Sequence, residues 1–134
     1  HGRIVNIASS AGLRGYPYAA AYVASKHALV GYSRCAAAEL ESTGVTLNLV
    51  CPHYVDSPMT EETVARIVRK TKKSEAETRA FLAAQNPGGT LVSPEEVAEC
   101  VLRFVRGDEN GRVAELIGGR GRLPDSETVL WSRV

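Results

Sequence analysis

Three polar side chains near the start of the chain have the types and the spacing that proton transfer requires. Tyr22 and Lys26 stand four residues apart, so a helix would place both on one face, one turn apart. A tyrosine hydroxyl is a poor acid or base at neutral pH, but a cation held beside it favours the phenolate. Ser9 follows an apolar run and can bring a second hydroxyl to the phenol, because ligands of open α/β sheets lie beyond the carboxyl ends of the strands. Tyrosine and lysine at this spacing are also common on ordinary helices, so the pair alone does not decide between a structural and a catalytic role.

The segments that must position these residues alternate between strand and helix. Strands are predicted at residues 3–8, 45–51 and 113–119, and a long helix from about Tyr18 to Ser42, with Gly44 as its stop signal. This alternation predicts an α/β fold with a parallel sheet and right-handed crossovers. The sheet would have three strands, since the tail from residue 120 shows no clear pattern.

Further helices are expected where capping signals occur. Ser57 precedes Pro58, which suits an N-cap followed by proline at the first helical position. Ser74 and Ser93 each have a glutamate three residues later, which is the pattern of a capping box. The second box leads into an apolar stripe at helical spacing, formed by Val97, Val101, Phe104 and Val105.

The composition is that of a soluble globular protein with one core: of 134 residues, 44% are hydrophobic and 23% are charged. A net charge of +1 gives no overall attraction to nucleic acid or to a membrane surface, and no apolar run is long enough to span a bilayer. Cys35, Cys51 and Cys100 lie far apart and lack metal-ligand spacing. We therefore expect buried, reduced thiols, no metal site, no nucleic-acid or membrane partner, and a cytoplasmic location.

Several sequence blocks in a fixed order make a catalytic role for the tyrosine and lysine more specific than their spacing alone. GRIVNIASSAG is followed by YVASKHALVG and then by the run from AAEL to DSPM, while SPEEVAECVLRFV and VAELIGG come later. In this order the blocks resemble the C-terminal half of the short-chain dehydrogenase/reductase family over about residues 2–119. The resemblance implies the C-terminal portion of a Rossmann-like, three-layer α/β/α fold, with residues 1–134 as a single domain.

The resemblance also implies a role for each of the three polar residues. Ser9 matches the catalytic serine, Tyr22 the acid/base, and Lys26 the residue that holds the nicotinamide ribose and assists the tyrosine. NAD or NADP would exchange a hydride while a secondary alcohol and a ketone interconvert. A small-molecule substrate of the 3-hydroxyacyl and 3-ketoacyl thioester type is suggested by analogy with acyl-reducing members of the family.

The segment CPHYVDSPM resembles the family loop that embraces the nicotinamide. By position, Pro52 would lie beside the ring, backbone groups near Val55 would meet the carboxamide, and Ser57 would both cap the next helix and touch the carboxamide. His53 departs from the family pattern, which usually has glycine there. Two interpretations stay open for it: a partly exposed loop histidine without a chemical task, and a functional one.

Two family features are missing from the sequence: the Gly-rich turn that cradles the pyrophosphate, and the helical asparagine of the catalytic site. We therefore expect the N-terminal cofactor half to be absent and the first strand to expose an apolar edge. The chain would pair with that half or form a homo-oligomer, in which Ala36, Ala37 and Ala38 of the long helix allow close approach. The alternative function is a truncated or non-catalytic interaction subunit that lacks a complete cofactor site.

The basic segment RIVRKTKK at residues 66–73 also has two interpretations. The simpler one is a solvated helix face, because runs of charge usually face water. The other is a contact with a phosphate-bearing substrate such as an acyl-CoA.

Overall fold

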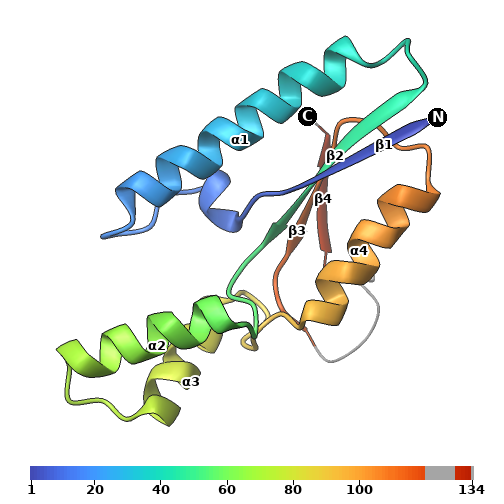
Figure 1. Cartoon of the computed structure of the whole chain (residues 1–134). Coiled ribbons are helices and arrows are strands. Elements are labelled where there is room, and N and C mark those ends of the chain that lie inside the picture. Colours follow the sequence, from blue (N-terminus) through green and yellow to red (C-terminus); the bar gives the residue numbers. More distant parts are fainter. Residues whose placement is uncertain (120–128, 134) are drawn as a thin grey trace.

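A four-stranded sheet forms the centre of the computed structural model, which describes residues 1–119 and the backbone of residues 129–133. The strands β1 (Gly2–Ile7), β2 (Val45–Pro52), β3 (Arg112–Leu116) and β4 (Val129–Arg133) lie side by side in sequence order (Figure 1). The first three are parallel, and β4 runs antiparallel to β3. The predicted α/β fold with a parallel sheet is confirmed for β1 to β3, whereas the prediction of three strands was wrong because it missed β4.

Helices cover both faces of the sheet, α1 (Ala20–Glu39) on one side and α4 (Pro94–Arg106) on the other (Figure 1). Neighbouring residues of a strand point to opposite faces, so β2 supplies both layers of the core. Leu49 and Cys51 pack with Val30 of α1. Val50 packs with Cys100 and Phe104 of α4. The structure therefore has the three layers that the resemblance implied, with two apolar clusters on either side of one sheet.

The element boundaries differ from prediction where the backbone leaves regular geometry. Tyr18 has a φ of +64°, in the left-handed region, so it cannot belong to α1, which begins at Ala20. The helix ends at Glu39 rather than Ser42, and Gly44, with a φ of +76°, lies in the turn that leads into β2. The third strand runs from Arg112 to Leu116 and ends before Ile117, so the predicted range 113–119 was wrong by one residue at its start and three at its end.

The predicted apolar stripe of α4 is only partly correct. Phe104 is fully buried, but Val105 is 45% exposed, because successive helical residues lie about 100° apart around the axis. Cys100, which the stripe omitted, is buried beneath the helix. Cys35 of α1 is exposed, which corrects the expectation that all three thiols are buried.

A pair of helices, α2 (Pro58–Lys70) and α3 (Glu75–Gln85), lies beyond the carboxyl ends of the strands (Figure 1). Residues 54–56 and 86–92, here called the neck, connect it to the sheet, with Val55 and Val92 bridged in parallel. The side chain of Asn86 is 1% exposed and bonds to three backbone groups: it accepts from the Tyr54 N–H (3.0 Å) and donates to the Tyr54 carbonyl (2.9 Å) and the Thr90 carbonyl (2.7 Å). This residue therefore fixes both chains of the neck.

One edge of the sheet is open. β1 is the outermost strand, and Ile4 and Ile7 are 41% and 45% exposed. Within residues 1–119 and 129–133, no helix combines the length and the apolar character needed to cross a membrane.

Candidate functional site

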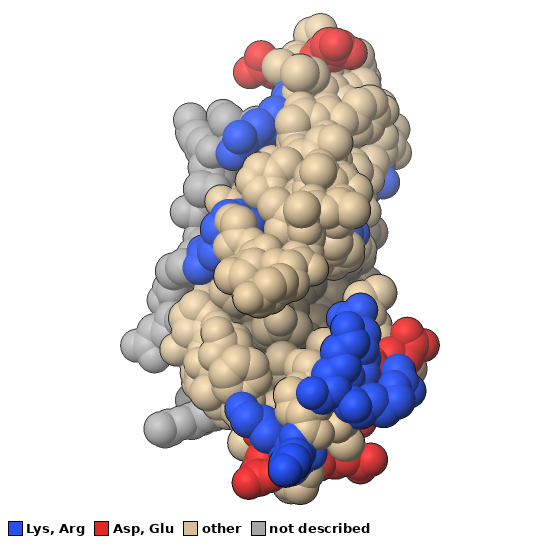
Figure 2. All heavy atoms as spheres, turned by 90° about the vertical axis from the view of Figure 1, so that its left-hand side faces the viewer, with Lys and Arg blue, Asp and Glu red and all other residues tan. Residues whose placement is uncertain are grey.

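An open cleft of about 1220 Å³ lies at the carboxyl ends of β1 and β2, between the start of α1 and one side of α2. All six residues singled out from the sequence line it, namely Ser9, Tyr22, Lys26, Pro52, Val55 and Ser57. Figure 2 shows this side of the molecule, with a hollow above a group of Lys and Arg side chains. The expected convergence at one cleft is therefore observed, while the roles of the residues stay predictions.

The two serines after β1 have different partners. The Ser9 hydroxyl accepts a hydrogen bond from the Ala11 N–H at 3.1 Å and so caps the short 3₁₀ helix η1 (Ser10–Gly12). Because the oxygen accepts in this bond, its own proton remains available for a ligand in the cleft. Ser10 is 4% exposed, and its hydroxyl lies 2.9 Å from the Tyr16 hydroxyl. Ser9 thus meets the cleft, and Ser10 holds the following loop in place.

Tyr22 and Lys26 lie on the first turns of α1, as their spacing required. The Lys26 ammonium donates to the carbonyl of Ile7, the last residue of β1, at 3.2 Å. It also lies 5.8 Å from the centre of the Tyr22 ring. Tyr22 is 43% exposed, and its hydroxyl has no hydrogen-bond partner among residues 1–119. The strand end therefore holds the cation beside a phenol that is open to a ligand.

The loop after β2 offers unpaired polar groups to the cleft. In the bridge to Val92, the Tyr54 carbonyl accepts from the Val92 N–H and the Asp56 N–H donates to the Val92 carbonyl. The N–H and C=O of Val55 therefore point to the opposite side. The Ser57 hydroxyl does not cap α2, which corrects half of the prediction for this residue. Val55 and Ser57 both line the cleft, and within the described residues neither the Val55 backbone nor this hydroxyl has a hydrogen-bond partner. Together these groups can both donate to and accept from one ligand.

His53 is buried, which corrects the interpretation of a partly exposed loop residue. It is 8% exposed, and its Nε2 lies 2.6 Å from Oε1 of Glu115 on β3. Its backbone N–H donates to the Leu116 carbonyl at 3.0 Å. Arg14, in the loop after η1, forms an ion pair with the same carboxylate. The hydrogen bond from His53, together with the Arg14 charge, lowers the pKa of Glu115 against the opposing effect of burial. The imidazole therefore ties the cleft loop to β3.

Sequence reasoning missed Arg14, Glu115 and Asn86. A charged residue inside the otherwise apolar segment VAELI was the one available signal for Glu115. Nothing near Arg14 in the sequence indicates Glu115, and nothing near Asn86 indicates Tyr54, because these partners are distant along the chain.

The cysteines near the sheet have no chemical role in the cleft. Burial raises the pKa of the Cys51 thiol to about 11 and that of Cys100 to about 12. Both would be protonated at neutral pH and therefore poor nucleophiles. The expectation of buried core thiols is confirmed for these two.

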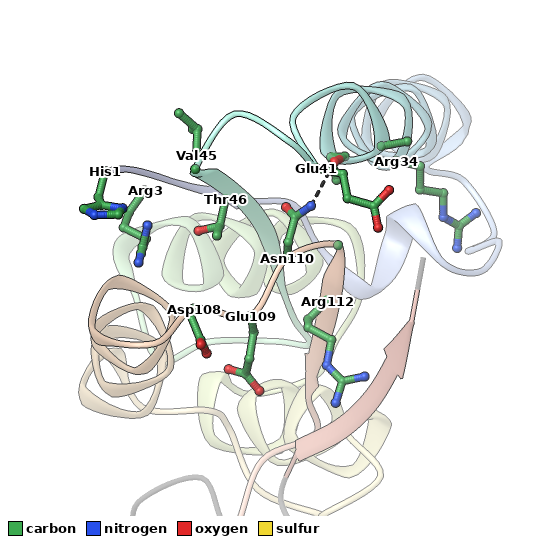
Figure 3. A pocket seen from close by; sticks show the side chains of 14 residues that line it. His1, Arg3, Arg34, Glu41, Val45, Thr46, Asp108, Glu109, Asn110 and Arg112 are labelled. Atoms are coloured by element: carbon green, nitrogen blue, oxygen red, sulfur yellow. Dashed lines mark hydrogen bonds between the residues drawn. The ribbon is translucent and has the colours of Figure 1, made fainter.

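A second pocket, of about 940 Å³, lies at the opposite end of the strands and contains none of the predicted site residues (Figure 3). Acidic and basic side chains face each other around it, namely Arg3, Arg34, Glu41, Asp108, Glu109 and Arg112. Thr46 also lines it, and its buried hydroxyl has no hydrogen-bond partner in the described part of the chain. A dashed line marks the bond of 2.9 Å from the Asn110 amide to the Ala37 carbonyl.

Comparison with known proteins places this geometry in context. The model of the family described as short chain dehydrogenase matches residues 1–67, which include the six predicted site residues. A putative ketoacyl reductase of Streptomyces coelicolor is 43% identical over 104 residues, covering 78% of this chain and 40% of that protein. A D-beta-hydroxybutyrate dehydrogenase of Cupriavidus necator is 38% identical over 97 residues, covering 72% of this chain and 38% of that protein.

Solved structures show the same similarity. The crystal structure of an actinorhodin polyketide ketoreductase variant with NADPH superposes with a TM-score of 0.72 at 41% identity, over 78% of this chain and 40% of that chain. The chain thus spans about four-tenths of the length of the relatives it matches.

Proposed function

Because this chain belongs to the short-chain dehydrogenase family, we propose that it is the catalytic half of an NAD(P)-dependent oxidoreductase that interconverts a secondary alcohol and a ketone. The observation that carries the proposal is the single cleft in which Ser9, Tyr22 and Lys26 meet the loop after β2. A hydroxyl, a phenol and an ammonium grouped at strand ends can polarise a carbonyl and move one proton.

In the reducing direction, Ser9 donates its free proton in a hydrogen bond to the substrate carbonyl oxygen, since its oxygen already accepts from Ala11. Tyr22 transfers its phenolic proton to the same oxygen as the carbonyl carbon is reduced. Lys26, fixed by the Ile7 carbonyl, stabilises the phenolate that remains. Oxidation of the alcohol runs through the same proton transfer in reverse.

The cleft fits a nicotinamide as the redox group. A carboxamide both donates and accepts hydrogen bonds, and the Val55 backbone with the Ser57 hydroxyl offers unpaired partners of both kinds. Pro52 is buried at the end of β2 and gives a flat apolar contact for the ring, while Lys26 would also reach the ribose. When bound, a reduced nicotinamide supplies the hydride that the chain's own residues cannot supply.

A 3-keto or 3-hydroxy compound is the substrate class that we favour. The support comes from the relatives, which are named for a ketoacyl and for a beta-hydroxybutyrate, two compounds of that type. The cleft volume of about 1220 Å³ leaves room for such a substrate beside a nicotinamide.

Substitution of Tyr22 by phenylalanine tests the mechanism. The assay follows nicotinamide absorbance in a polypeptide that joins this chain to a Gly-rich βαβ half of the family, and in this chain alone. We expect no appreciable turnover by the chain alone, and a loss of about a hundredfold or more for Tyr22→Phe in the joined protein. Tyr32→Phe is the matched control, because Tyr32 lies on the same helix, is 66% exposed and does not line the cleft. Wild-type turnover by Tyr22→Phe would refute the assigned proton transfer.

One observation favours a second candidate, an interaction subunit that binds another chain without turnover. The edge of β1 is apolar and open, as Ile4 and Ile7 show, and such an edge can pair with a strand from elsewhere. The joined protein separates the two candidates, since an interaction subunit would remain inactive with every ketone tested.

A further inference from the structure

The α2 side of the cleft carries two arginines whose charges have no partner. Arg66 and Arg69 line the same cleft as Tyr22. Within the described part of the chain, neither guanidinium forms an ion pair or a side-chain hydrogen bond. Figure 2 shows Lys and Arg side chains gathered beside the hollow.

The nearby acids do not neutralise this pair. Asp56 and Glu61 both form ion pairs with Arg79 of α3, and neither of them lines the cleft. Among the described lining residues, Glu62 is the one carboxylate of the cleft. Because Arg66 and Arg69 carry two positive charges against this one, the α2 wall keeps a positive excess.

The arginines share one cleft with the reacting groups. Arg66 and Arg69 line it together with Tyr22 and Tyr54. Met59 and Val97 also line the cleft and provide apolar contact for a short carbon chain.

The second pocket differs from the cleft in its balance of charges. There Arg3 donates to the carbonyls of Gly107 and Gly2 at 2.9 and 3.0 Å, and three carboxylates accompany the three arginines Arg3, Arg34 and Arg112 (Figure 3). Among the described residues of the cleft, one carboxylate accompanies Lys26, Arg66 and Arg69. The charges of Arg66 and Arg69 are therefore available to a ligand.

We propose that Arg66 and Arg69 bind an anionic group, a carboxylate or a phosphate, of the ketone that reacts at Tyr22. A guanidinium presents planar, paired donors that match both anions. The inference rests on the proposed function and adds the charge of the substrate to it. It also separates the basic segment into two parts, since Lys70, Lys72 and Lys73 are exposed and do not line the cleft.

Kinetics in the joined protein give the first test. The probes are acetoacetate, its neutral methyl ester, acetoacetyl pantetheine and acetoacetyl phosphopantetheine, which share one reacting carbonyl. We expect KM for at least one anionic probe to rise about tenfold in Arg66→Gln and in Arg69→Gln, with KM for its neutral counterpart unchanged. Lys70→Gln removes the same charge from the same helix outside the cleft and should change neither. The probe that responds identifies carboxylate or phosphate as the anion.

Direct binding keeps the inference testable if turnover is absent. The Arg side-chain N–H signals of the chain are followed by NMR while acetoacetate or phosphopantetheine is added. We expect shifts of two arginine signals, lost in the Arg66→Gln, Arg69→Gln double variant and retained in Lys70→Gln. Binding of an anion without turnover of any probe would refute the proposed function but would still support an anion site at these arginines.

Three results would overturn the inference. One is an equal rise of KM for charged and neutral probes, and another is the absence of any shift with either anion. The third is a rise in KM for the nicotinamide cofactor alone, which would assign the arginines to the cofactor. In the first and third cases the parent protein still reduces ketones, so the proposed function survives.

Discussion

Two neighbouring serines, Ser9 and Ser10, differ in burial and in partner. Ser10 is enclosed and bonded to Tyr16, while Ser9 keeps its proton for the cleft. Removal of the Ser9 hydroxyl and removal of the Ser10 hydroxyl should therefore have different effects, although the two residues are adjacent.

Ser9→Ala should lower turnover of the joined protein by about a hundredfold and leave the midpoint of urea unfolding nearly unchanged, since Ser9 gives up one weak cap. Ser10→Ala should do the reverse: it should cost about 1 kcal/mol of unfolding free energy, because the Tyr16 hydroxyl loses its partner, and retain most turnover. Paired assays of turnover and unfolding check this. Equal effects of the two changes on turnover would contradict it.

Glu115 makes the stability of the chain depend on pH. Its pKa is held below the ordinary 4.5, first by the His53 hydrogen bond and then by the Arg14 charge, so its contribution is present above 4.5 and is lost as the pH falls through the lowered value. Glu115→Gln should cost about 1–3 kcal/mol at pH 7, the usual cost of leaving buried groups unpaired. The difference from the parent should shrink below pH 4.5.

Urea unfolding at several pH values measures this effect. Arg14→Gln should keep most of the pH dependence, because the hydrogen bond from His53 is the largest cause of the shift. A gap between parent and Glu115→Gln that stays constant from pH 7 to pH 3 would show that the carboxylate charge is not involved.

Helix starts were predictable where the signal is local. Ser74 and Ser93 form complete capping boxes with Glu77 and Glu96, as their spacing indicated. Ser57 has the same residue type at its helix start, but its hydroxyl is left for the cleft. A serine before a helix thus predicts the helix, not the partner of the hydroxyl.

The side of α4 that faces the sheet can be tested with two neighbouring residues. Phe104→Ala should cost about 3–5 kcal/mol of unfolding free energy, because the ring is fully buried beside Val50. Val105→Ala, one position on and 45% exposed, should change it by about 0.5 kcal/mol or less. Chemical denaturation of both variants checks the prediction, and similar losses would contradict the observed rotation of the helix.

The parts of the fold and of the site that could not be predicted from the sequence depend on contacts between segments that are distant along the chain. Ser9, Tyr22 and Lys26 were found because their spacing and their neighbours lie within one short stretch. β4 pairs with β3 across residues 117–128, and five strand residues alone carry no clear period. Glu115 lies 62 residues from His53 and Tyr54 lies 32 residues from Asn86, so no local pattern could reveal these two contacts.

Two surfaces of the molecule are candidates for contacts with another chain. β1 exposes Ile4 and Ile7 along an edge with unpaired backbone groups. The outer side of α1 is lined by small exposed residues such as Ala24 and Ala28, but Ala37, one of the three alanines predicted for a subunit contact, is 2% exposed and faces the sheet. An interface through α1 stays a prediction, on a narrower set of residues.

The isolated chain should self-associate through β1. Ile4→Lys should shift it toward monomer, because a charged residue on an edge strand opposes pairing with another edge. Sedimentation at micromolar concentration measures the change. Val105→Lys is the control, since it places the same charge at a residue of similar exposure, 45% against 41%, away from the edge. An equal shift by both variants would mean that net charge, rather than β1, governs association.

The neck allows ligand choice to evolve separately from folding. α2 and α3 pack mainly on one another, and residues 54–56 and 86–92 connect them to the rest of the chain. Asn86 and one backbone bridge hold these two short chains together. The two apolar clusters that hold the sheet together draw no residue from positions 58–85. Mutations can therefore accumulate over generations in this helix pair, or a whole pair can be exchanged by recombination, without loss of the core. A lineage that kept Asn86 and the two short chains of the neck could acquire new substrates by changing α2 alone.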